Sequence, residues 1–416
     1  MTLVFRNARV VTMSPVGVAG AGGAEIARRG GAMSELGVLE RADVVIEGER
    51  IVAVGVDAGA RVKAIRAIDA AGRVLMPGFV DAHTHVLCSG DRLDEWEMKR
   101  RGVTYLDILK AGGGIMSTVR AVRAAGESEL AAGLRARLKE MLRCGTTTVE
   151  VKSGYGLSCD AEMKMLGVIE SVQREGNSLP TVVGTALLGH AIDPGVERNR
   201  FIETVIGKGL DDVHGRWPRM AIDAFCEDGA WTKDECVRLF ERAIALGHPI
   251  RVHADQFNSL GMVEWAITHE ARSVDHLEAS SPELLKKIGH SGTFAVAIPC
   301  TGFHTDGRYA NMRAVVDAGG AAVVATNWNP GSSPCGSMPM AMALAVRHCG
   351  LSPAEAMVAG TVNAAALLGF TDRGMIAPGM RADLVLLRHT DERMLVYEFG
   401  GNPVDVVVAG GVEVSG

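Results

Sequence analysis

Short apolar runs alternate with stretches of helical periodicity through most of the chain. Eight such runs occupy residues 74–82, 146–151, 181–184, 220–225, 250–253, 273–276, 293–298 and 321–326. Each is short enough to be a single buried strand. Repeated alternation of strands and helices predicts a parallel sheet, and eight units spread over about 300 residues predict a closed (β/α)8 TIM barrel of class α/β.

Both ends of the chain show a different pattern, in which apolar and polar residues alternate over short strands with turns between them. These strands are predicted at residues 3–11, 42–46, 51–55, 382–387 and 403–409. Because both ends carry the same kind of pattern, we expect them to pair. The sequence therefore predicts a small discontinuous β-sandwich domain from residues 1–75 and 377–416, beside a catalytic barrel domain from residues 76–376.

Composition excludes several classes of partner. With 416 residues, 47% of them hydrophobic, the chain can bury a large core. A net charge of −6 without a basic tract argues against nucleic-acid binding. No apolar run reaches 18 residues and the first residues lack the order of a signal peptide, which predicts a cytoplasmic protein without membrane contact. A homodimer is the default expectation. The eight cysteines form no Cys-x-x-Cys pair, so neither a zinc ribbon nor a disulfide framework is expected.

Histidines follow several of the predicted barrel strands. His83 and His85 lie two residues apart, so on a strand their rings point the same way and can grip one metal ion. Tyr155, His190, His253, His276 and Asn327 follow other apolar runs. In a TIM barrel these positions share the face at which the strands end. Neutral imidazole is a preferred ligand of transition metals, so His83, His85 and His253 are the predicted metal ligands.

Two segments carry a family resemblance. Residues 77–85, Pro-Gly-Phe-Val-Asp-Ala-His-Thr-His, resemble the first-strand signature of the amidohydrolase superfamily, and residues 374–384 resemble its closing strand. Within that superfamily the chain is similar to the imidazolonepropionase family, which opens a five-membered imidazolone ring in histidine degradation. That similarity rests on blocks spread over nearly the whole chain, including residues 90–92, 147–156, 253–256, 274–277 and 329–332.

The resemblance implies a role for each matching residue. It makes His83, His85 and His253 metal ligands, and it implies catalytic roles for His276, Gln256 and His190. The implied substrate contacts are Arg92, Tyr155, His190, Gln256, Asn329, Gly331 and Ser332. A guanidinium fork suits the propionate tail of an anionic heterocycle, and phenol, imidazole and amide groups suit its ring atoms.

Two of these assignments have simpler alternatives. Arg92 could instead form a surface salt bridge, which contributes little. His276 could orient the attacking water or stabilise charge on the substrate, but it could also be hydrogen-bonded to a neighbouring loop. Lys152 is interpreted as structural, because the resembled family uses this block in a site with one metal.

Asn327 departs from the resembled family, which carries Asp there as the last metal ligand and proton shuttle. An amide offers the metal a carbonyl oxygen but cannot take a proton from water, so the site loses one negative charge. We expect Asn327 to join the three histidines around one divalent ion. Zinc and iron both suit these ligands, and zinc is favoured because hydrolysis needs a redox-silent Lewis acid. Cys300 and His304 follow the seventh strand, where they either contact the substrate or belong to a repacked loop.

The predicted function is metal-dependent hydrolysis of a ring C–N bond in an imidazolone that bears a propionate, giving an N-formimino-glutamate-type product. Asn327 supports one alternative, a desulfhydrase that releases hydrogen sulfide from 3-(5-oxo-2-thioxoimidazolidin-4-yl)propionate. Hydrosulfide leaves readily as an anion, so that reaction has less need of a carboxylate. A non-catalytic binding protein on the same scaffold is a further alternative. A deaminase of purines or triazines receives no support from residues 152–156.

Overall fold

The computed structural model describes residues 2–14, 27–103, 113–176 and 179–414. Within them it contains two sheets, each of eight strands. One is the parallel sheet of the predicted barrel, and its strands follow one another in sequence order. They are β6 (Phe79–Asp81), β7 (Thr146–Lys152), β8 (Thr181–Gly189), β9 (Ala221–Cys226), β10 (Ile250–Ala254), β11 (Ser273–His276), β12 (Phe294–Ala297) and β13 (Ala322–Val324).

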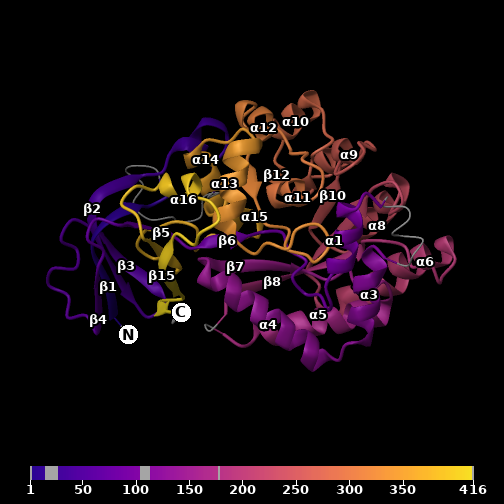
Figure 1. Cartoon of the computed structure of the whole chain (residues 1–416), viewed down its shortest axis with the longest axis horizontal. Coiled ribbons are helices and arrows are strands. Elements are labelled where there is room, and N and C mark those ends of the chain that lie inside the picture. Colours follow the sequence, from indigo (N-terminus) through magenta and orange to yellow (C-terminus); the bar gives the residue numbers. More distant parts are fainter. Residues whose placement is uncertain (1, 15–26, 104–112, 177–178, 415–416) are drawn as a thin grey trace.

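Helices separate these strands in sequence and lie outside them (Figure 1). In chain order they are α1 (Leu93–Arg100), α3 (Ile115–Ala124), α4 (Glu127–Arg143), α5 (Cys159–Gln173), α6 (Arg198–Thr204), the π-helical turn η2 (Val205–Gly209), α7 (Leu210–Arg216), α8 (Lys233–Ala245), α9 (Met262–Thr268), α10 (Pro282–Gly289), α11 (Pro299–His304), α12 (Met312–Asp317), α13 (Met338–His348), α14 (Pro353–Ala359) and α15 (Val362–Leu367). The predicted TIM barrel is confirmed.

Helix α8 shows why such a segment folds as it does. Thr232 caps its first turn, and Glu235 completes a capping box with it. The buried side chains recur every three or four residues, so they form a single apolar stripe; they are Cys236, Leu239, Phe240 and Ala243. That stripe fixes which face of the helix packs against the barrel.

The second sheet joins the two ends of the chain, as Figure 1 shows by the neighbouring N and C labels. Its strands are β1 (Thr2–Val11), β2 (Val38–Glu47), β3 (Arg50–Gly55), β4 (Arg66–Asp69), β5 (Val74–Pro77), β14 (Leu384–Leu387), β15 (Val404–Ala409) and β16 (Val412–Glu413). The short helices η1 (Gly30–Ser34) and α16 (Met394–Tyr397) belong to the same two end segments. Strand pairing connects all eight strands into one branched mixed sheet, in which β5 pairs with β1 on one side and β14 on the other.

The apolar run at residues 74–82 is divided between the two sheets. Strand β5 ends at Pro77 and β6 begins at Phe79, so the change of sheet falls at Gly78. A Cβ at Gly78 would lie 2.4 Å from the side-chain oxygen of Thr147 in β7. Only glycine therefore lets the chain pass this close to the barrel wall. Periodicity alone reads the run as one strand, because apolar residues continue through both sheets.

The barrel closes between its first and last strands through bonds that lie beyond the strand pairing. The buried carboxylate of Asp81 accepts the Thr326 hydroxyl at 2.5 Å and the Thr326 N–H at 3.1 Å. Past the strand ends, Asn327 N–H donates to the His83 carbonyl and His85 N–H donates to the Trp328 carbonyl, both at 3.0 Å. Burial raises the pKa of Asp81 to about 7. This seam places His83, His85 and Asn327 next to one another.

Across the described ranges, no helix is both long and apolar enough to cross a bilayer.

The close approach at Gly78 can be tested by adding one methyl group. We expect Gly78→Ala to lower the free energy of unfolding by about 1–3 kcal/mol, because the buried Thr147 leaves the new Cβ no room. Gly215→Ala in α7 is the matched control, since nothing lies within 4 Å of a Cβ there. Calorimetry should show a lower melting temperature for Gly78→Ala and an unchanged or higher one for Gly215→Ala. An unchanged melting temperature for Gly78→Ala would contradict this account of the packing.

Candidate metal centre and active site

Five histidines meet where the barrel strands end. The ring centroids of His83 and His253 lie 4.5 Å apart, and those of His83 and His85 lie 5.3 Å apart. His190 stacks on His85 at 5.2 Å. His276 completes the group, with its ring 5.5 Å from that of His253. All five are the histidines that follow predicted strands, and β6, β8, β10 and β11 bring them to one place.

Three of these rings form a donor group suited to a metal ion. One nitrogen from each of His83, His85 and His253 lies within 4.8 Å of the others. The Nε2 atoms of His85 and His253 face each other at 3.2 Å, and the buried Nε2 of His83 has no hydrogen-bond partner. Burial lowers the pKa of all three rings well below the ordinary value, so they are neutral. Neutral imidazole is the form that binds metals.

Asn327 is joined to His83 by a backbone hydrogen bond, and its side chain carries an amide oxygen. Its Nδ2 donates to the hydroxyl of Thr301 at 2.9 Å, which fixes the orientation of the amide. The Oδ1 atom is then buried without a hydrogen-bond partner. The three imidazole nitrogens of the metal group suit a divalent cation, and the amide oxygen of Asn327 is a further neutral atom without a partner.

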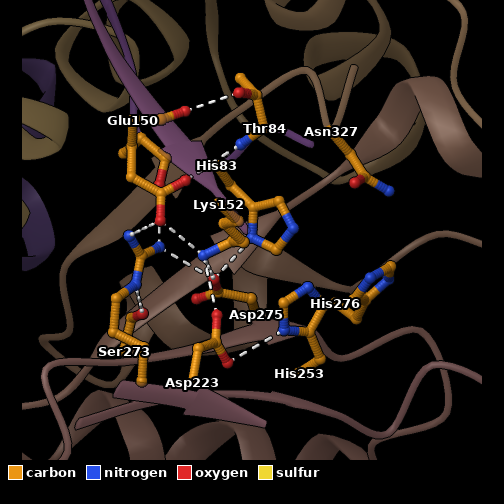
Figure 2. Close-up of polar contacts among 12 residues, drawn as sticks. His83, Thr84, Glu150, Lys152, Asp223, His253, Ser273, Asp275, His276 and Asn327 are labelled. Carbon is orange, nitrogen blue, oxygen red and sulfur yellow. Dashed lines mark hydrogen bonds and ion pairs between the residues drawn. The ribbon is translucent and has the colours of Figure 1, made fainter. Parts of the chain in front are cut away.

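A cluster of buried charges lies behind the rings. Asp275 Oδ2 accepts the Nδ1 proton of His83 at 2.6 Å, and Asp223 Oδ1 lies 3.1 Å from Nδ1 of His253. Since a carboxylate only accepts, each ring donates from Nδ1 and keeps Nε2 for the ion. In Figure 2 these carboxylates lie on one side of the rings and Asn327 lies on the other.

Two buried cations pair with these carboxylates and with a third, Glu150. Lys152 Nζ lies 2.7 Å from Glu150 Oε1 and 2.8 Å from Asp223 Oδ2 (Figure 2). Arg251 reaches Asp275 at 2.9 Å and Glu150 at 3.2 Å. All five side chains are at most 3% exposed. Lys152 also lies 3.9 Å from Asp275, so its ammonium group is surrounded by carboxylates inside the barrel, and its interpretation as structural stays a prediction.

Most of these buried charged residues were not predicted from the sequence, although the sequence contains a pattern that indicates them. Polar residues occur at every second position within the buried strands, as in the pairs Glu150 and Lys152, Arg251 and His253, and Ser273 and Asp275. Residues two apart point to the same side of a strand. The pattern therefore indicates a charged barrel interior beneath the histidines.

The strands that carry the site end in strained backbone. Positive φ angles occur at Asp255 (56°), His276 (89°), Leu277 (72°) and Asn327 (55°). Such conformations cost about 1–3 kcal/mol at a residue other than glycine and persist where the surroundings impose them. They turn the chain sharply at the ends of β10, β11 and β13. The side chains of the site are thereby held at fixed angles.

Tyr155 and His190 form one wall beside the metal group. Their ring centroids lie 5.3 Å apart, and the Tyr155 ring lies 6.0 Å from that of His85. Burial raises the pKa of Tyr155, so its phenol stays a hydrogen-bond donor. His190 Nδ1 donates to the Gly154 carbonyl at 2.8 Å, and burial lowers its pKa to about 4. The lone pair on His190 Nε2 is then available as an acceptor.

Arg92 and Gly331 come together from distant parts of the sequence. A Cβ on Gly331 would lie 2.4 Å from Arg92 Nη1, so the guanidinium rests against the glycine backbone. Its Nε and Nη2 atoms bind Glu95 at 2.8 and 2.5 Å. The Arg92 side chain is 11% exposed, so this ion pair is largely buried rather than a surface salt bridge. Nη1 remains on the side that faces the loop of residues 329–332.

Asn329 organises that loop. Its Oδ1 accepts the N–H groups of Gly331 and Ser332, both at 2.8 Å, and its Nδ2 donates to the Asn327 carbonyl at 2.7 Å. The Ser332 hydroxyl lies 3.0 Å from Asn329 Nδ2. Substrate contacts by Asn329 and Ser332 remain predictions, and the observed bonds give both a role in placing Gly331 and Asn327.

Gln256 lies on the loop that follows β10 and is partly buried. The buried carboxylate of Glu227 holds this loop by accepting the N–H of Phe257 at 2.8 Å and that of Asn258 at 3.2 Å. Glu227 comes from the loop after β9. Glu227 and Gln256 lie far apart in the sequence, so no local sequence pattern indicates that their two loops are in contact.

The segment after the seventh strand contributes Thr301, the hydrogen-bond partner of Asn327, which was not predicted. Cys300 is buried and its thiol lies beside that of Cys335, while His304 is partly buried. A second residue that sequence reasoning missed is Glu278, whose carboxylate lies 3.2 Å from His276 Nδ1.

Comparison with solved structures supports the fold. The chain is similar to a mutant of atrazine chlorohydrolase from Arthrobacter aurescens complexed with zinc and atraton, with a TM-score of 0.68, 19% identity, and coverage of 99% of this chain and 94% of that one. An adenosine deaminase from Xanthomonas campestris with bound zinc gives a TM-score of 0.66 at 20% identity, covering 99% of this chain and 92% of that one. At these identities the similarity shows the fold alone.

Sequence comparison is more specific than comparison of folds. The amidohydrolase family matches residues 74–414. The chain is 41% identical over 396 residues to an imidazolonepropionase of Herpetosiphon aurantiacus, covering 92% of each chain. It is 42% identical over 386 residues to an imidazolonepropionase of Deinococcus radiodurans, covering 93% of this chain and 95% of that one. The chain therefore belongs to the amidohydrolase family and, within it, to the imidazolonepropionases.

Proposed function

We propose that this enzyme hydrolyses the ring of an imidazolone that bears a propionate tail. Water adds to the ring carbonyl carbon, the ring C–N bond breaks, and a formimino-glutamate-type product results. The observation that carries the proposal is the histidine metal group, found in a chain whose relatives are named imidazolonepropionases. Arg92, largely buried against Gly331, supports it by offering a cation for the propionate.

The donor set of His83, His85, His253 and Asn327 would hold one divalent ion, for which zinc is the better choice than iron. A bound divalent ion polarises the group under attack and lowers the pKa of water. The carboxylates of Asp223 and Asp275 hold two of the rings by their Nδ1 protons. They keep the donor nitrogens aimed at one point, which preserves the geometry during the reaction.

The remaining residues bind and orient the substrate. Arg92 receives the propionate carboxylate, with which a guanidinium forms a charged hydrogen bond. The protonated phenol of Tyr155 donates to the ring oxygen, and Nε2 of His190 accepts a ring N–H. His276 takes the proton of the attacking water and passes it to the leaving nitrogen. Gln256 contacts the substrate from the loop after β10.

One observation favours a second candidate function, desulfuration of the 2-thioxo analogue. The four proposed donors would all be neutral, because Asn327 has an amide at a position where a carboxylate would hold a proton. In that reaction water replaces sulfur at the ring carbon and hydrosulfide leaves. A thiol-type leaving group departs as an anion and needs no proton from the site.

Turnover of two substrates distinguishes the two candidate functions. The zinc-loaded enzyme is incubated with imidazolone propionate and, separately, with its 5-oxo-2-thioxo analogue, while ring absorbance and sulfide are followed. We expect the absorbance of imidazolone propionate to decay as the formimino product accumulates. Release of sulfide from the analogue, without turnover of imidazolone propionate, would replace the first function by the second. Turnover of neither substrate would contradict both.

The metal group predicts how metal content responds to substitution. His85→Ala removes a donor whose Nδ1 contacts no carboxylate, so it leaves no buried acid unpaired. We expect metal content after dialysis to fall by more than about tenfold, as measured by mass spectrometry of the protein. His269→Ala, at an exposed histidine after α9, is the control and should retain the metal. Full metal content in His85→Ala would show that the ion binds elsewhere.

The propionate assignment predicts a loss that depends on the substrate. Arg92→Met removes a charged hydrogen bond worth about 1.5–3 kcal/mol, so kcat/KM for imidazolone propionate should fall by about 10- to 150-fold, mainly through KM. Arg101→Met, at a side chain 75% exposed after α1, should leave it unchanged. With a substrate analogue that lacks the carboxylate, wild type and Arg92→Met should be equally slow. An equal loss of kcat/KM on both substrates would show that Arg92 does not bind the propionate.

A further inference from the structure

Glu278 lies against a histidine of the site. Its Oε1 is 3.2 Å from His276 Nδ1, and the two side chains are 6% and 3% exposed. The other oxygen, Oε2, is buried without a hydrogen-bond partner in the described part of the chain. A carboxylate offers acceptors only, so Nδ1 of His276 carries the proton of this bond. In the neutral ring the lone pair is then on Nε2.

The loop that carries Glu278 is attached to the end of β10 by hydrogen bonds that do not involve the Glu278 side chain. Leu277 N–H donates to the Ala254 carbonyl at 3.2 Å, and Ala279 N–H donates to the Asp255 carbonyl at 2.7 Å. The Ser280 hydroxyl adds a 2.7 Å bond to the Asp255 carboxylate. The loop therefore has its own attachment to the end of β10, and a purely structural role does not account for a buried carboxylate at position 278.

Glu278 differs from the other carboxylates that contact site histidines in having no cationic partner among the described residues. Asp223 is paired with Lys152, and Asp275 is paired with Arg251. Glu278 contacts none of the cations among the described residues. Its negative charge is therefore not cancelled by a neighbour. Asn327, on the other side of the site, supplies no charge.

The His276 ring also lies close to the rings of the metal group. It lies 5.5 Å from the His253 ring and 5.9 Å from the His83 ring, measured between centroids, and Figure 2 shows it beside His253. The positive φ angles of His276 and Leu277 turn the chain so that Glu278 returns to the Nδ1 edge of the ring. Ring and carboxylate thus form a fixed pair at the edge of the metal group.

We propose that Glu278 is a positioning residue for the hydrolysis, acting through His276. It holds the proton on Nδ1, so that Nε2 accepts the proton of the attacking water, and its charge stabilises the imidazolium that forms. His276 then gives that proton to the ring nitrogen as the C–N bond breaks, and the dyad returns to its starting state. This inference rests on the proposed function, because it assigns His276 the proton transfer.

Glu278→Gln tests the charge, because glutamine keeps the shape and one acceptor oxygen. We expect kcat for imidazolone propionate to fall by about 10- to 100-fold with KM and metal content unchanged. Glu264→Gln in α9, at a side chain 47% exposed, is the matched control and should match wild type. If kcat of Glu278→Gln equals that of wild type, the charge has no role and the inference is wrong.

A double variant tests whether Glu278 acts through His276. His276→Asn alone should lower kcat at least as much as Glu278→Gln. Adding Glu278→Gln to His276→Asn should cause no further loss, because the partner through which the carboxylate acts is gone. Independent losses that multiply in the double variant would overturn the inference, since they would show a separate role for Glu278.

Nitrogen NMR of the zinc-loaded enzyme, with labelled histidine, gives a readout that needs no substrate. We expect Nδ1 of His276 to be protonated in wild type and to lose this fixed tautomer in Glu278→Ala. If wild type fails to turn over imidazolone propionate, the proposed function fails, and the NMR result still decides where the proton lies. An unprotonated Nδ1 in wild type would contradict the inference whatever the kinetics show.

Discussion

The site depends on a set of charges buried in the barrel interior. Asp223 and Asp275 accept the Nδ1 protons of His253 and His83. Lys152 and Arg251 pair with these two acids and also with Glu150. Removing one member of such a network leaves an uncompensated buried charge, which is strongly destabilising. The network thus fixes the ring orientation and the tautomer of two donors at once. The same buried ion pairs therefore stabilise the barrel and hold the metal-binding rings in place.

A second constraint is the closure of the barrel. The carboxylate of Asp81 joins β6 to the segment after β13, and the backbone bonds of His83 and Asn327 continue that seam. His83 and Asn327, from opposite ends of the barrel sequence, therefore become neighbours. Thr301 then turns the Asn327 amide so that its oxygen is free. If Asn327 completes the proposed donor set, that set carries no charge, so a bound ion would be a stronger Lewis acid and proton transfer would fall to a histidine.

The barrel, the second sheet and the histidine group were predictable from sequence, because their signals are local. These signals are apolar runs between helical stretches, alternating strands at the chain ends, and histidines at strand ends. Other features depend on contacts between distant segments. Gly78 divides one apolar run between two sheets because Thr147 lies against it. Arg92 meets Gly331 only after the barrel closes, and Glu278 reaches His276 through a strained turn that periodicity does not encode. Asn329 matches a family block, yet its amide bonds organise its own loop.

The central claim is that one divalent ion is bound by neutral donors only. A crystal structure of the zinc-loaded enzyme, with anomalous scattering measured at the zinc edge, tests it most directly. The account predicts one zinc peak within about 2.0–2.2 Å of donor atoms of His83, His85, His253 and Asn327. A peak bound by a carboxylate, two peaks, or an Asn327 amide turned away from the ion would contradict it.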